Sequence, residues 1–151
     1  MGLLRVEEMT RDDASMVRVP IHGVAVCAGF PSPADDFLEG AIDFPRWLAP
    51  NPPATFAFNV SGWSMVGAGV HDRDLAVADR SLPPVHRSVV VAVVDGTISL
   101  KRLLIEDGAH RLTFDNPDMP AFAVEEMAEG AIWGVVRFSI RWHVARAGLV
   151  R

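Results

Sequence analysis

Two β-prone segments that meet at Asp95-Gly96 constrain the fold of this chain more than any other feature. Residues 88–94 are a nearly continuous apolar run, and residues 97–105 form a second, largely apolar segment. Asp-Gly between two such segments is a strong signal for a tight hairpin. An apolar run of this length, bounded by turn signals, is typical of a strand that is buried on both faces. The centre of the chain therefore predicts a β-hairpin inside a sheet.

The segments around this hairpin have the same character. Glu106-Asp107-Gly108 marks a second turn, and residues 115–120 form a proline-containing loop. Further strands are expected at residues 55–60, 74–79, 111–114 and 132–144. The fold class that follows is mainly β, a twisted sheet domain with one or two short helices.

The N-terminal quarter is harder to interpret. Residues 17–26 are β-prone, but Pro20 and Gly23 interrupt them, which favours an edge strand or a mobile segment over a central strand. No helix-turn-helix fits into an arm this short. Residues 34–42 are expected to form a short helix, because prolines precede them, acids stand in the first turn and the apolar positions 37, 38, 41 and 42 share a face.

Composition excludes several classes of function. The 151 residues, half of them apolar, suffice for one domain with a core. A net charge of −5 argues against a broad phosphate-binding surface. The single cysteine, Cys27, fits a reducing compartment, and the charged N-terminus and the lack of an eighteen-residue apolar run predict a cytoplasmic protein with no membrane anchor. No motif indicates a metal ion or a cofactor.

Lys101 and Ser64 are the candidate catalytic residues. Lys101 is the only lysine, beside thirteen arginines, and it lies inside an apolar run. Arginine keeps its proton in a protein, whereas a desolvated lysine can lose it and act as a base. On spacing alone, a structural lysine whose stem follows a strand edge is the commoner case. Ser64 follows a turn at Gly62, and a serine hydroxyl needs such a base to become a nucleophile. The five histidines show no triad spacing and receive no catalytic role.

Four segments resemble a known family in order and approximate spacing. Ser61-Gly62-Trp63-Ser64-Met65 is similar to the Ser-Gly-x-Ser-Met motif of LexA/UmuD-type self-cleaving proteins, peptidase family S24. Residues 27–36 resemble the segment around the self-cleavage site of that family, and residues 69–75 resemble a Gly-(Ile/Val)-x-x-Gly-Asp-Leu segment. Residues 95–103 look like the hairpin that bears the catalytic lysine. The likeness runs from about Gly29 to Trp142.

This resemblance implies a function. Ser64 matches the nucleophile, Lys101 the general base, and Ala28-Gly29 the bond that is cut. Residues 1–28 would then be a removable arm and residues 29–151 a peptidase-like β domain. Two positions depart from the family pattern: Trp63 occupies the variable place before the nucleophile, and Arg73 replaces a glycine.

The resemblance also implies partners and a pathway. We expect an SOS-response mutagenesis protein that cuts itself when a RecA filament on single-stranded DNA activates it. The processed form would be a homodimer and an accessory subunit of an error-prone, UmuC-type Y-family translesion DNA polymerase, without sequence-specific DNA binding of its own. The missing DNA-binding unit and the stretch Phe30-Pro31-Ser32-Pro33 favour this type over a LexA-like repressor.

Two alternatives remain open. The chain could be a non-catalytic regulatory or interaction module, or the remnant of a phage-type repressor, that keeps the fold but does no chemistry. A signal-peptidase-like enzyme shares serine–lysine chemistry but needs a membrane anchor, which the sequence does not predict.

Overall fold

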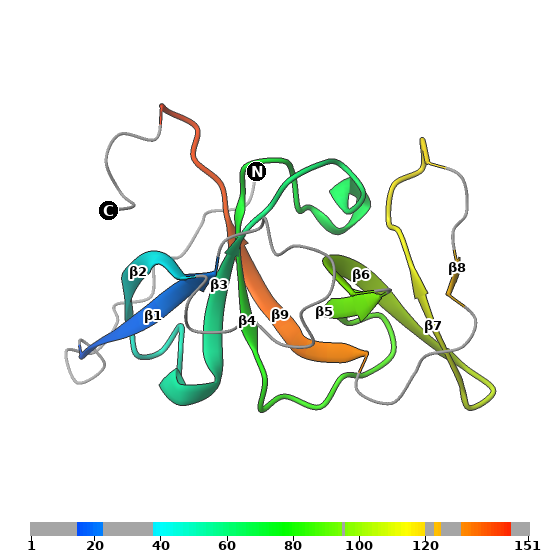
Figure 1. Cartoon of the computed structure of the whole chain (residues 1–151), viewed down its shortest axis with the longest axis horizontal. Helices are drawn as coiled ribbons and strands as arrows, with labels where there is room; N and C mark the ends of the chain where they lie inside the picture. Colours follow the sequence, from blue (N-terminus) through cyan, green and yellow to red (C-terminus); the bar gives the residue numbers. More distant parts are fainter. Residues whose placement is uncertain (1–14, 23–37, 95, 120–122, 125–130, 146–151) are drawn as a thin grey trace, which may run out of the picture.

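A computed structural model describes residues 15–22, 38–94, 96–119, 123–124 and 131–145. These residues form one nine-stranded sheet with two short 3-10 turns, and no α-helix occurs in this part of the chain (Figure 1). The 3-10 turns are η3 (Pro52–Ala54) and η4 (Val66–Ala68). The strands are β1 (Met16–His22), β2 (Leu38–Pro45), β3 (Thr55–Asn59), β4 (Leu75–Asp79), β5 (Val89–Val94), β6 (Thr97–Glu106), β7 (Ala109–Thr113), β8 (Ala123–Val124) and β9 (Ile132–Ile140).

The strand order is β2-β1-β3-β4-β9-β5-β6-β7-β8. All neighbouring pairs are antiparallel except β1 and β3, which run parallel. Figure 1 shows β1 and β2 at one end of the sheet, β7 and β8 at the other, and β4 and β9 between them. The mainly β fold class predicted from the sequence is confirmed.

The central hairpin forms as the sequence predicts. β5 and β6 pair in register from Val94 opposite Thr97 to Val89 opposite Arg102. Gly96 has a φ of 74°, a left-handed value that glycine adopts at little cost. At the next turn, Asp107 and Gly108 both have positive φ, as the tight hairpin between β6 and β7 requires. The strands expected at residues 55–60, 74–79 and 111–114 are also present, shifted by one or two residues.

The core extends along the sheet as three apolar clusters. The first joins β1 to β4 and contains Val17, Val19, Ile21, Phe44, Ala49, Ala57, Leu75 and Val77. The second, around Trp133, contains Phe58, Ala78 and Val91, and the third contains Val90, Ala92, Leu103 and Leu112. All five residues of β4 are buried: Leu75 and Val77 belong to the first cluster and Ala78 to the second, so the strand contributes to the core on both faces.

The prediction that residues 17–26 form an edge or mobile segment is wrong for the part that the structure describes. β1 lies between β2 and β3, and Val19 and Ile21 are fully buried. Pro20 is tolerated because the pairing with β3 covers only Ile21 and His22. The longer pairing of β1 with β2 supplies the contacts that hold the strand in place.

The helix predicted over residues 34–42 is also wrong where the structure describes it. From Leu38 the chain is in β2, whose residues pair with β1, and Gly40 has a positive φ of 142° that glycine tolerates. Pairing with β1 outweighs the local helix signals, which are a weak prior. Residues 34–37 lie outside the described part.

The strand expected at residues 132–144 ends at Ile140, four residues early. Beyond it the chain leaves the sheet and carries Arg141 toward the segment between β3 and β4. No helix among the described residues is long and apolar enough to cross a membrane.

Candidate functional site

Ser64 lies in the connection between β3 and β4, which folds into a compact loop. Gly62 opens the turn with a φ of 93°, a conformation that favours glycine. After Ser64, Met65 is buried, and its carbonyl accepts hydrogen bonds from the N–H groups of Ala68 (3.0 Å) and Val70 (3.2 Å). The buried Met65 side chain anchors the loop and leaves Ser64 half-buried beside it.

Two backbone bonds and one side-chain bond close the base of this loop. The Val60 N–H donates to the Asp74 carbonyl at 2.8 Å, and the Arg73 N–H donates to the Val60 carbonyl at 2.9 Å. The Gly62 N–H donates to Asp72 Oδ1 at 2.8 Å. Arg73 itself has a φ of 70°, so it adopts the left-handed conformation that a glycine would take at this position. The turn is therefore kept despite the substitution, at the cost of backbone strain.

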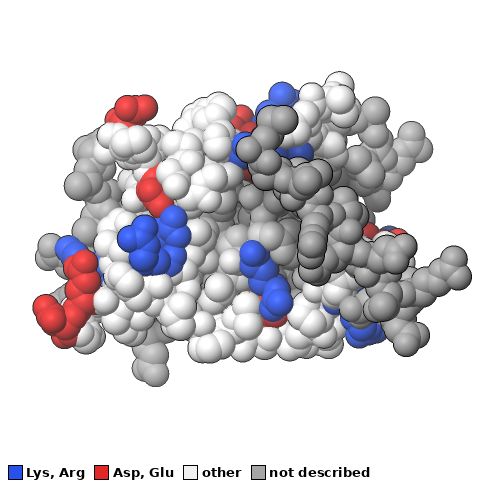
Figure 2. Space-filling view, turned by 180° about the vertical axis from the view of Figure 1, so that it is seen from behind, with Lys and Arg blue, Asp and Glu red and all other residues white. Residues whose placement is uncertain are grey.

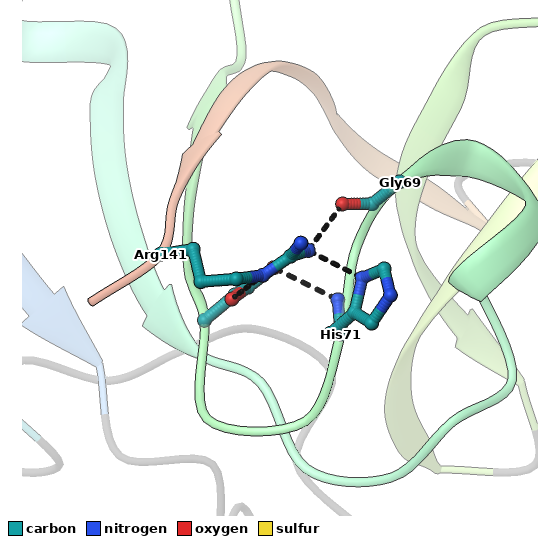
Figure 3. A network of polar contacts seen from close by, with 4 residues as sticks. Gly69, His71 and Arg141 are labelled. Atoms are coloured by element: carbon teal, nitrogen blue, oxygen red, sulfur yellow. Dashed lines mark hydrogen bonds and ion pairs between the residues drawn. The ribbon is translucent and has the colours of Figure 1, made fainter. Parts of the chain in front are cut away.

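Arg141 holds the far side of the same connection (Figure 3). Its guanidinium donates to the Gly69 carbonyl at 2.7 Å and contacts the His71 ring. It also donates to both carboxylate oxygens of Asp74, at 3.0 and 2.9 Å. Burial raises the pKa of Asp74, but the hydrogen bonds from Arg141 and from the His71 N–H outweigh it and leave that pKa below its ordinary value. The ionised carboxylate thus ties the loop to the end of β9.

An apolar cleft opens beside Ser64. Its volume is about 120 Å³, several times the ~15 Å³ that one water molecule needs. Ser64 shares it with side chains from the end of β3 and from the β5–β6 hairpin. The lining residues are Phe58, Asn59, Val60, Ser61, Gly62, Ser64, Met65, Val91, Ile98, Ser99 and Leu100. A cleft of this kind suits a short extended peptide with a small apolar side chain.

Lys101 is buried on β6, with only 5% of its surface exposed. Its Nζ donates to Ser99 Oγ at 2.8 Å and to the Leu100 carbonyl at 3.4 Å, and it lies 4.5 Å from the centre of the Phe114 ring. Burial lowers the pKa of Lys101 below its ordinary value. The lysine therefore loses its proton more readily than a solvent-exposed one, as a general base requires.

The cleft brings Ser64 close to the lysine-bearing strand. Residues 99 and 101 share one face of β6, Ser99 lines the cleft together with Ser64, and Ser99 Oγ holds the Lys101 ammonium. Within the described residues, Lys101 Nζ makes no hydrogen bond with Ser64 Oγ. The bond predicted to be cut, Ala28-Gly29, lies outside the described residues.

Sequence reasoning missed several residues of this site. Ser99 carries a signal that could have found it, because it stands two positions before Lys101 on a predicted strand and so shares its face. Asp115 and Asn116 carry none. Both lie in the loop that the sequence predicts, yet the Asp115 N–H donates to the Ser64 carbonyl at 2.9 Å and Asn116 Nδ2 donates to the Trp63 carbonyl at 2.7 Å.

Charge on the surface is dispersed. On the face seen in Figure 2, Lys and Arg form separate small groups, several with acidic residues beside them. Arg18 and Asp43 form one exposed ion pair of opposite charges. No broad basic surface is visible among the described residues on this face.

The described residues form a mainly β domain in which an apolar cleft lies beside a serine on a tight loop, with a buried lysine on the adjoining hairpin. This combination is compatible with the class of serine peptidases. The comparisons with known proteins agree. The Peptidase S24-like family model matches residues 20–137, and the chain therefore belongs to the Peptidase S24-like family.

Individual relatives support this assignment. The chain is 34% identical to Protein MucA of Salmonella typhimurium over 142 residues, which is 93% of this chain and 97% of the relative. It is 39% identical to Protein ImpA of the same species over 125 residues, 82% of this chain and 83% of the relative. It is also 33% identical to the LexA repressor of Clostridium novyi over 111 residues, 74% of this chain but only 54% of that protein.

Proposed function

We propose that this protein is a self-cleaving mutagenesis protein of the SOS response. Its substrate is its own segment upstream of Gly29, and Ser64 and Lys101 are the residues that cut it. The observation that carries the proposal is the position of the lysine: it is buried, its pKa is lowered, and it is held by a serine of the cleft that Ser64 lines. Membership of the Peptidase S24-like family supports the same chemistry.

The reaction begins when Lys101 Nζ, neutral and turned from Ser99 toward Ser64, takes the proton of the Ser64 hydroxyl. The serine oxygen attacks the carbonyl carbon of Ala28, and the Ser64 N–H, on the turn after Gly62, is the candidate donor to the oxyanion that forms. The protonated lysine then gives its proton to the amine of Gly29, which leaves. Water, deprotonated by the lysine, attacks the acyl-serine. The lysine returns its proton to the Ser64 oxygen as that oxygen leaves, and the carboxylic acid released at Ala28 ionises.

A slow catalyst suffices for this reaction. The substrate is tethered to the enzyme, so its effective concentration is high, and each molecule is cut once. The rate is then set by how often the segment around Ala28-Gly29 occupies the cleft. A partner that binds the occupied state, which we propose to be the RecA filament on single-stranded DNA, raises that fraction.

Purified full-length chain provides the test. After incubation at alkaline pH, or with the activated RecA filament at neutral pH, intact-mass spectrometry should find two fragments that correspond to residues 1–28 and 29–151. Ser64→Ala and Lys101→Arg should remain whole, the latter because arginine keeps its proton. Ser139→Ala, on β9 and outside the cleft lining, is the matched control and should cut normally. Cleavage of Ser64→Ala at the same bond would refute the assignment and favour a non-catalytic interaction module.

The processed form, residues 29–151, is proposed to dimerise and to serve an error-prone Y-family DNA polymerase as its accessory subunit. The resemblance to LexA/UmuD-type self-cleaving proteins implies this role, and the chain is similar to Protein MucA and Protein ImpA over most of its length. Sedimentation equilibrium of the cleaved protein should give twice the protomer mass. Cells that carry only Ser64→Ala should show fewer damage-induced mutations than cells with the wild-type chain.

A further inference from the structure

We propose that the ion pair between Arg102 and Asp115 positions the Ser64 loop against the strand that carries Lys101. Both are positioning residues, because neither belongs to the pair that would do the chemistry. The inference rests on the proposed function, since it assigns the two residues a role in the rate of self-cleavage.

The first observation is how closely the Ser64 loop lies on Asp115. The Asp115 N–H donates to the Ser64 carbonyl at 2.9 Å, and the Asp115 carbonyl accepts from the Gly67 N–H at 2.7 Å. A Cβ atom placed on Gly67 would lie 2.2 Å from Asp115 Oδ1 and 2.8 Å from its carbonyl oxygen. The absence of a side chain at Gly67 therefore lets the loop rest directly on Asp115, and any shift of Asp115 moves the loop.

The second observation is that Arg102 fixes the Asp115 carboxylate. Arg102 Nε and Nη2 both donate to Asp115 Oδ2, at 3.0 and 2.5 Å. The remaining guanidinium nitrogen, Nη1, donates to the Arg87 carbonyl at 2.6 Å. The guanidinium is thus held on two sides, so its orientation is determined and it can set the place of the carboxylate.

Third, Arg102 directly follows Lys101 on β6. Adjacent residues of a strand point to opposite faces, so Arg102 holds this strand from the face opposite the lysine. On the lysine side, the ring of Phe114 lies 4.5 Å from Lys101 Nζ. Phe114 and Asp115 are consecutive, and together they contact β6 on both faces: Phe114 contacts Lys101, and Asp115 contacts Arg102.

Neighbouring contacts extend the same arrangement. Asn116, next in the chain, donates from Nδ2 to the Trp63 carbonyl at 2.7 Å, one residue before Ser64. Residues 114–116 therefore contact the lysine, its strand and the serine loop. The sheet does not depend on this contact, because β6 and β7 pair over five residue pairs without it. The side chains of Arg102 and Asp115 are 18% and 30% exposed, so the ion pair is partly buried between the loop and β6.

Rates of self-cleavage measured from neutral to alkaline pH test the inference. Asp115→Asn and Arg102→Gln should each lower the alkaline plateau by about 10- to 100-fold, because small misplacement of reacting groups is costly. In Asp115→Asn the pH midpoint should not move to higher pH, since Lys101 stays buried and the loss of a negative charge does not raise its pKa. The double variant should be no slower than the slower single variant, because the two residues act as one unit. Asp118→Asn, at an exposed position in the same loop, should cut like the wild type.

Three results would overturn the inference: single variants that cut at the wild-type rate, a double variant whose losses multiply, or a midpoint displaced to higher pH in Asp115→Asn. The last would mean that water reaches Lys101 and that the pair has a general structural role. These results leave the proposed function standing as long as the wild type cuts itself and Ser64→Ala does not. A wild-type chain that is never cut would instead overturn the proposed function, and this inference with it.

Discussion

Truncation of Ile21 tests whether β1, which precedes the proposed cleavage bond in the chain, contributes to the stability of the core. Ile21 is fully buried in β1 and belongs to the cluster that also contains Ala57 and Leu75. Ile21→Ala removes three carbon atoms, which at about 0.8 kcal/mol each gives about 2.4 kcal/mol before any cavity term. Measured Ile→Ala costs at such sites are about 2–5 kcal/mol, so we expect about 3 kcal/mol.

The assay is urea unfolding in the Ser64→Ala background, which keeps the chain intact. For a chain of this size, a loss of about 3 kcal/mol also lowers Tm by roughly 6–12 °C. Met16→Ala is the matched control on the same strand, because Met16 is 58% exposed, and it should change the free energy of unfolding by less than about 0.5 kcal/mol.

A loss below about 1 kcal/mol for Ile21→Ala, similar to that of Met16→Ala, would refute the placement of β1 inside the sheet. The expected result has a consequence for processing. Cleavage at Ala28-Gly29 would leave β1 attached to the rest of the sheet by non-covalent contacts alone.

The remaining predictions concern the loop and the lysine. Arg73→Gly should raise the free energy of unfolding by about 1 kcal/mol, because it relieves the positive φ of 70°. A lower free energy of unfolding, measured by urea denaturation, would show that the arginine side chain stabilises the fold by more than the strain costs. Burial lowers the pKa of Lys101 below the ordinary 10.5, so between the folded pKa and 10.5 the unfolded chain binds more protons and stability should rise with pH. Lys101→Met should abolish that rise, which amounts to about 1.4 kcal/mol for each unit by which the pKa is lowered. A variant whose free energy of unfolding rises with pH as steeply as that of the wild type would contradict the prediction. Because the pKa of Asp74 is lowered from 3.8, its stabilisation is present above that pH and lost as pH falls through the folded value. Arg141→Gln should therefore destabilise the chain at pH 7 and much less near pH 2 in thermal melts; an equal loss at both would rule out the ionised pair.

The strands that the sequence predicts correctly are those with local signals. Asp95-Gly96 and Asp107-Gly108 determine their turns through backbone conformations that few residues tolerate, and apolar runs flank them. β1 and β2 carry weak or misleading local signals. Pro20 argues against a central strand, and the acids and apolar spacing ahead of β2 resemble a helix start, but pairing between the two strands decides both cases.

The residues of the site also divide into those with a local sequence signal and those without one. Ser64 and Lys101 stand out in the sequence, by motif and by the uniqueness of the lysine, and Ser99 follows from strand alternation. Asp115 could not be predicted, because its contacts with Ser64 and Arg102 exist only when three distant segments meet. Nothing in a proline-containing loop marks one of its acids as the partner of a serine 51 residues earlier.

The titration of Lys101 tests the central claim most directly. Because it is the only lysine, labelling lysine with ¹³C at Cε gives a single side-chain signal that reports its protonation. In the Ser64→Ala chain, its midpoint should lie below 10.5 and should coincide with the pH midpoint of self-cleavage in the wild type. A lysine that titrates at its ordinary value, or at a pH where the cleavage rate does not change, would show that Lys101 is not the base.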